Sequence, residues 1–186
     1  MKRVTDVDIA EMRSRGYSSN TISEAEWDRD RTLIADDLCM QIEAAFTGVT
    51  LGDGIGLWEA QGLDDCESEE TCAQYREGDE KVDWKAIHPD VLDRCSSSLS
   101  FFDAAGFRFH LPAFLIVELT VGTVAEMVGA LVSESDFGQS RYELFSEAQR
   151  GVIRDFLLFA RDDRDYSFQQ TEIDAALSGY WRDDVR

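Results

Sequence analysis

The sequence predicts a mainly α-helical (α+β) protein, in which one compact helical domain carries a small antiparallel β-hairpin near residues 99–110. Three observations lead to this expectation. Apolar residues recur at helical spacing in several segments, capping sequences precede some of them, and strict apolar–polar alternation occurs once. A chain of 186 residues with 44% apolar residues can bury its own core. We expect an N-terminal arm over residues 1–22 and a single acidic helical domain over residues 23–186.

The first long helix is expected to run from Ser23 to about Phe46. Ser23 and Glu26 have the spacing of a capping box, in which each side chain accepts a hydrogen bond from the other residue's backbone N–H. Apolar residues follow at helical intervals, and Gly48 ends the segment. The polar residues before Ser23 form the predicted arm.

Four glycines within residues 52–62 predict a surface loop, with a short helix around Trp58. No Gly-Lys-Ser or Gly-Lys-Thr follows them, so this loop is not a P-loop. Ser68 is placed to cap another short helix that ends near Arg76, and a further short helix is expected to begin near Pro89.

The β-hairpin is expected because Phe107, Phe109 and Leu111 alternate with Arg108 and His110, which is the period of a strand. A four-residue turn from Asp103 to Gly106 would precede this strand. In that register the two phenylalanines belong to the core, whereas Arg108 and His110 line the surface.

Three helices are expected after the hairpin. The first, from Pro112 to about Val132, is apolar nearly all round and should be central; Glu118 and Glu126 argue against a membrane span. Its small residues Gly122, Ala125 and Gly129 share one face, which would pack within the molecule or, alternatively, form a homodimer. Capping sequences predict the other two helices, one running from Ser146 to about Arg161 and the last beginning at Thr171.

The charge of the chain points to a class of partner. Its 38 acidic and 18 basic residues give a net charge of −20, which repels nucleic acid and anionic membranes and attracts basic proteins. Residues 59–83 alone hold ten acidic residues and two basic ones. This acidic segment is either a solvated face or a docking surface for a basic protein. The docking interpretation assigns partner binding to Trp58, Asp64, Asp65, Glu67, Glu69, Glu70, Asp79 and Glu80.

No cofactor and no metal are expected. None of the four cysteines forms a CxxC pair, and the two histidines are not spaced with them as in a zinc motif. We expect four free thiols in a reducing compartment. Because no apolar segment follows the basic Met1-Lys2-Arg3, we expect a cytoplasmic protein.

The run LSFFDAAGFRFHLPAF, from Leu99 to Phe114, resembles the signature of an uncharacterised bacterial domain-of-unknown-function family. Further similarities are a Trp before an acidic turn with proline (Trp84 to Asp90), the segment from Glu147 to Arg150 and a terminal helix from Ala176 to Trp181. The resemblance covers about residues 30–181 and brings no activity with it. Small acidic bacterial proteins of this kind are often immunity proteins, which is an association only.

These observations predict a binding protein and not an enzyme. The leading hypothesis is an immunity protein that binds and occludes a basic toxin, such as a nuclease. One alternative is a DNA mimic that inhibits a nucleic-acid-binding protein. Another is an enzyme that uses Asp103, Arg108 and His110, since a carboxylate can orient a histidine for proton transfer.

Overall fold

The computed structural model describes residues 4–122 and 127–182, and this part of the chain is helical without any strand. The mainly α prediction is therefore confirmed, and the β-hairpin is wrong. The α-helices are α1 (Asp6–Ser14), α2 (Ser19–Ala45), α3 (Leu57–Asp64), α4 (Glu69–Gly78), α5 (Pro89–Arg94), α6 (Ala104–Thr120), α7 (Met127–Leu131), α8 (Asp136–Ser140), α9 (Glu147–Arg161) and α10 (Gln170–Ser178). Short 3₁₀ helices are η1 (Trp84–Ala86), η2 (Ser96–Ser100) and η3 (Arg164–Gln169).

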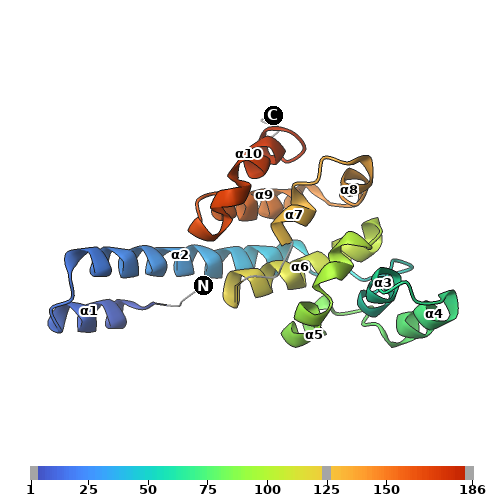
Figure 1. Ribbon diagram of the computed structural model, residues 1–186, viewed down its shortest axis with the longest axis horizontal. Coiled ribbons are helices and arrows are strands. Elements are labelled where there is room, and N and C mark those ends of the chain that lie inside the picture. Colours follow the sequence, from blue (N-terminus) through green and yellow to red (C-terminus); the bar gives the residue numbers. More distant parts are fainter. Residues whose placement is uncertain (1–3, 123–126, 183–186) are drawn as a thin grey trace.

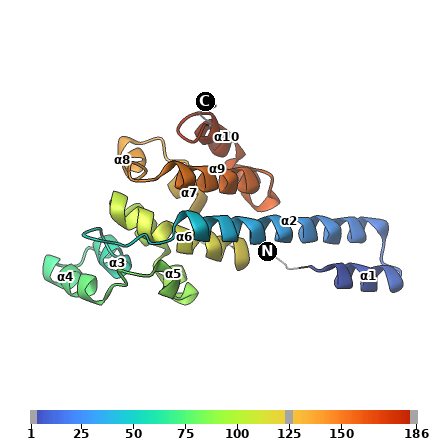
Figure 2. The ribbon, with the colours of Figure 1, turned by 180° about the vertical axis from the view of Figure 1, so that it is seen from behind.

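The helices are arranged around α2, which is the longest (Figure 1). Helix α6 packs along one side of α2, α9 packs along another, and α10 covers α9. Helix α1 folds back beside the N-terminal half of α2, whereas α3 and α4 lie at the opposite end of the molecule, as both views show (Figures 1 and 2). The two ends therefore present separate surfaces.

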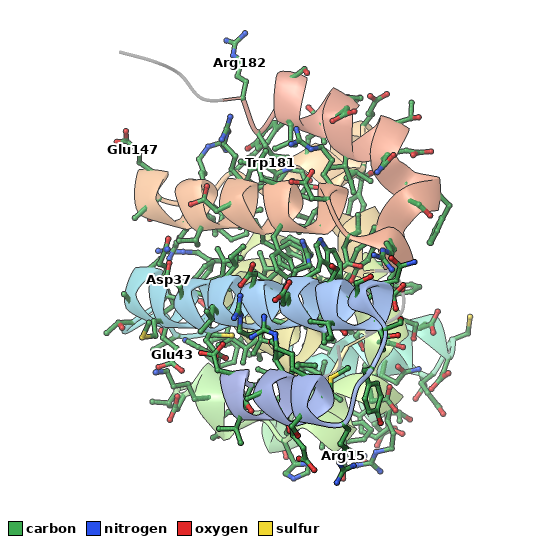
Figure 3. The ribbon with its side chains drawn as sticks, turned by 90° about the vertical axis from the view of Figure 1, so that its left-hand side faces the viewer. Arg15, Asp37, Glu43, Glu147, Trp181 and Arg182 are labelled. Atoms are coloured by element: carbon green, nitrogen blue, oxygen red, sulfur yellow. The ribbon has the colours of Figure 1, made fainter. Side chains whose placement is uncertain are left out.

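Buried aromatic residues join these layers and also satisfy backbone carbonyls. The indole of Trp181 donates to the carbonyl of Leu131 at 2.8 Å, and the indole of Trp84 donates to that of Phe46 at 3.1 Å. Figure 3 shows Trp181 between α9 and the end of the chain. Because a buried N–H needs an acceptor, each of these tryptophans fixes one orientation of the segments that it joins.

The segment expected as a hairpin, residues 99–110, instead contains the end of η2 and the first two turns of α6. Asp103 caps this helix, since its carboxylate accepts a hydrogen bond from the backbone N–H of Gly106 at 2.8 Å. Phe107 and Phe109 are fully buried, as expected, but His110 is buried as well. A helix enclosed on nearly every side carries apolar residues all round, so alternation of residue types no longer distinguishes it from a strand.

Two other helices begin earlier than expected. Ser18 caps α2, with its hydroxyl oxygen 3.2 Å from the backbone N of Thr21, and Ser23 lies inside the helix. The expected boundary between arm and domain therefore falls within α2. Helix α10 begins at Gln170, directly after η3, rather than after a Thr171 cap. The caps at Ser68 and Ser146 and the helix start at Pro89 are confirmed.

The expected long helix from Pro112 to Val132 is also divided. Helix α6 ends at Thr120, and Gly122 has a φ of +93°, a left-handed conformation that terminates a helix. The chain continues as α7 from Met127. Ala125, in the small-residue face considered for a homodimer, lies outside the described residues. Within the described ranges no helix is both long and apolar enough to cross a bilayer.

Candidate functional site

The acidic segment predicted to bind a partner forms a helical pair at one end of the molecule (Figure 1). Ser68 caps α4, and Glu69 and Glu70 occupy its first turn, where the helix dipole favours negative charge. Asp64 is half-buried, and the other carboxylates of this surface are exposed. We call this surface the acidic face; it consists of Asp64, Asp65, Glu67, Glu69 and Glu70.

A hollow of about 270 Å³ lies between α3 and α4 and is lined by Glu67 and Glu69 of the acidic face. Buried Cys72 and the exposed Leu63 and Ala73 give it an apolar surface, which we call its apolar base. A long basic side chain fits this chemistry, because its methylene groups can contact the apolar base while its charged end meets a carboxylate. The prediction from sequence missed Leu63, Cys72 and Ala73, since apart from Trp58 it selected only charged residues.

One cation of the protein already occupies an edge of this hollow. The Nε of Arg76 lies 2.7 Å from a carboxylate oxygen of Glu59, and both residues line the hollow. This hydrogen bond to Glu59 raises the pKa of Arg76. Glu59 is thus paired, which leaves Glu67 and Glu69 as the carboxylates that can receive a partner's cation.

Asp79, also predicted to bind a partner, is buried and serves the fold. Its carboxylate accepts hydrogen bonds from the backbone N–H groups of Trp58 and Glu59, at 2.8 and 3.2 Å, and so satisfies the first turn of α3. Burial raises the pKa of this carboxyl group. Gly56 allows the approach, because a Cβ there would lie 2.0 Å from an oxygen of Asp79. The placement of Asp79 on the docking surface is therefore corrected.

The remaining two predicted residues lie beside the acidic face. Glu80 is exposed, but one of its oxygens accepts hydrogen bonds from the backbone N–H groups of three following residues at 2.8–3.0 Å, which lowers its pKa. Trp58 is half-buried, and the guanidinium of Arg94 lies 5.4 Å from its ring centre. Glu80 stabilises a turn, and Trp58 is partly covered.

Asp103, Arg108 and His110, the residues of the enzymatic alternative, each have a structural environment. Asp103 caps α6, and the guanidinium of Arg108 donates to the side-chain oxygen of Gln149 at 3.0 Å. The ring of His110 stacks on Phe102 with centroids 4.5 Å apart, and burial lowers its pKa to about 4. Asp103 and His110 thus both bond the backbone of Gly106, whereas Arg108 bonds Gln149.

No metal site or disulfide occurs within the described ranges. They contain no group of three or more His, Cys, Asp or Glu side chains placed to hold a metal ion. All four cysteines are free thiols. Burial raises the pKa of the Cys95 thiol to about 11, which makes it a weak nucleophile.

Comparison with protein families matches residues 34–185 to DUF6714, a family of unknown function. The chain belongs to this family. The match agrees with the resemblance seen in the Leu99–Phe114 run and begins inside α2, so that α1 and the first half of α2 precede it. No curated protein and no solved structure matches the chain.

Proposed function

We propose that this protein binds a basic protein through its acidic face and blocks it by occlusion, as an immunity protein blocks a toxin. The observation that carries the proposal is the hollow in that face. Its apolar base and the carboxylates of Glu67 and Glu69 suit an inserted lysine or arginine, and the net charge of −20 favours a basic partner. A toxic nuclease is a suitable partner, since it needs a basic surface to bind nucleic acid.

The two parts of this surface act at different stages of binding. Exposed carboxylates at the rim of an interface chiefly accelerate association, because they steer a basic partner during diffusional encounter. A side chain buried in a hollow instead slows dissociation, since it must be hydrated again before it leaves. Neutralising the rim should therefore change the association rate more than the dissociation rate.

The test neutralises the acidic face and compares the result with an equal change of charge elsewhere. The face variant carries Asp65→Asn, Glu67→Gln, Glu69→Gln and Glu70→Gln. The control variant carries four changes at exposed acids of the α8–α10 side, Glu134→Gln, Glu143→Gln, Asp155→Asn and Glu172→Gln. Both variants have a net charge of −16. Both variants also lose favourable interactions with a helix dipole, because Glu69 and Glu70 lie in the first turn of α4 and Glu172 lies in that of α10.

The partner is first isolated from the native host with the wild-type protein as bait, and its association is then followed by stopped flow. At low salt we expect the association rate constant to fall on the order of tenfold for the face variant relative to the control, with a weaker dependence on salt. Equal rate constants for the two variants would show that overall charge, and not this surface, determines binding.

A further inference from the structure

The N-terminal hairpin of α1 and α2 has a small core of its own. Val4 and Ile9 pack with Ala25 of α2, and Met12 and Ile22 cover them. Gly16, with φ +74°, lies in the turn that reverses the chain between the two helices. The residues of this small core all precede residue 34, where the match to DUF6714 begins inside α2. The core is also separate from the main hydrophobic core.

The two edges of the hairpin differ in charge. On one edge Arg13 pairs with Glu26, and Arg29 pairs with Asp6 at 2.6 Å, so that acids and bases balance. The other edge is an open groove of about 370 Å³. Figure 3 views the molecule from this end and shows Arg15 beside the end of α1. Among residues 4–122 and 127–182, the ion pairs that join α1 to α2 therefore lie on the first edge.

The walls of the groove are two helical ridges. Asp8, Glu11 and Arg15 of the α1 segment are spaced by three and four residues, and so are Thr21, Glu24 and Asp28 of α2. Each set therefore lies along one face of its helix. Buried Val4 and Ala25 and half-buried Met12 supply the apolar surface between the ridges. Two parallel ridges with an apolar floor are the surface on which a third helix packs.

The negative charge of the groove favours a basic ligand. Among the described residues, four carboxylates and one guanidinium line it; Glu11 pairs with that guanidinium, of Arg15, and Asp8 accepts hydrogen bonds from Thr5. Within residues 4–122 and 127–182, no cation lies within ion-pair distance of Glu24 or Asp28. A second copy of this chain would bring another 20 negative charges, whereas a basic segment is attracted.

We propose that this groove is a second docking site, which receives an amphipathic helix with lysine or arginine on its flanks from a protein partner. The apolar face of that helix would contact Met12 and Ala25, and its cations would meet Glu24 and Asp28. Helix α1 has nine residues and so spans about 13 Å, which corresponds to between two and three turns of the partner helix. This site is separate from the acidic face, which lies at the other end of the molecule (Figure 2).

The experiment uses the full-length, ¹⁵N-labelled protein and an amphipathic helical peptide of leucine and lysine. The groove variant is Glu24→Gln with Asp28→Asn, and the control is Glu134→Gln with Glu143→Gln, which has the same net charge of −18. None of these four carboxylates caps a helix or forms an ion pair with a described residue. Circular dichroism checks that both variants are folded.

We expect the peptide to shift the amide resonances of residues 8–15 and 21–28, with a dissociation constant raised about tenfold by the groove variant relative to the control. Equal weakening by both variants would overturn the proposal. So would shifts confined to α3 and α4, although these would support the acidic face as a binding surface. Shifts of the same strength with an all-lysine peptide would exclude a role for the apolar floor. Concentration-dependent shifts without peptide would assign the groove to a second copy.

Discussion

His110 illustrates how the environment of one residue decides between chemistry and structure. The sequence placed it beside Asp103 and Arg108 on a strand surface, where it could transfer a proton. In the structure it faces the core, with Nδ1 2.8 Å from the carbonyl oxygen of Gly106 and with its ring stacked on Phe102. Nε2 is buried without a hydrogen-bond partner among the described residues. A ring in this position is easily kept neutral and is costly to protonate.

The burial of His110 should make the stability of the protein depend on pH. Burial lowers the pKa of His110 to about 4 in the folded protein, against about 6.5 in an unfolded chain. Between these values the unfolded state binds a proton that the folded state does not, so stability falls as pH decreases. From pH 7 to pH 4.5 we expect the wild type to lose about 2–3 kcal/mol more than His110→Phe, which retains an aromatic ring on Phe102.

Urea unfolding of both proteins at the two pH values provides the measurement. The comparison is necessary because the 38 acidic residues also titrate over part of this range, and the variant shares them. Parallel losses in the two proteins would show that His110 does not titrate differently in the folded and unfolded states.

At the scale of elements, capping sequences and apolar periodicity correctly predicted helices such as α4 and α9, whose ends are set by local interactions. The Ser146 cap and the apolar stripe of α9 both appear as expected, and Ser68 caps α4. The start of α2 was missed because two serines, Ser18 and Ser23, can both act as caps. Packing of α1 on Ile22 and Ala25 stabilises the helix that begins at the earlier serine. A capping sequence carries no information about such a contact between two helices.

The candidate site also combines features that the local sequence predicts with features that depend on contacts between distant residues. The run of acidic residues correctly indicated that most of its carboxylates are exposed, because charged side chains are rarely buried. It could not reveal that Asp79 turns inward, which depends on the first turn of α3, twenty residues earlier in the chain. Nor could it reveal the groove of the N-terminal hairpin, since that groove requires α1 to fold back on α2.

Alanine substitutions at Gly56 and Gly151 test whether the contact between Asp79 and α3 stabilises the acidic segment. At Gly56 an added Cβ would displace Asp79 and leave two backbone N–H groups of α3 without their acceptor, so Gly56→Ala should cost about 2–3 kcal/mol of stability. At Gly151, inside α9, no atom lies within 4 Å of an added Cβ. Gly151→Ala should therefore stabilise the protein by about 0.5–1 kcal/mol. Urea midpoints that move in the same direction would contradict this account of Gly56.

At the scale of the whole molecule, excess negative charge surrounds a few buried cations. Arg31 is buried and pairs with Asp163 at 2.8 Å. Arg141 is also buried, but within the described part of the chain no carboxylate lies within ion-pair distance; its guanidinium instead donates to the carbonyl of Leu99 and lies 4.8 Å from the ring centre of Phe107. Burial lowers the pKa of Arg141.

The same excess predicts that salt stabilises this protein. Carboxylates outnumber cations by 20, so repulsion between exposed acids opposes the compact state, and NaCl screens it. Screening also weakens exposed pairs such as Lys85 with Glu43, but such pairs contribute little. Between 10 and 300 mM NaCl we expect a gain of about 1 kcal/mol, or about 2–4 °C in Tm for a chain of this size. The gain should be smaller in the variant with Glu134, Glu143, Asp155 and Glu172 neutralised, because its net charge is −16. A Tm that falls with NaCl would mean that ion pairs contribute more to stability than repulsion removes.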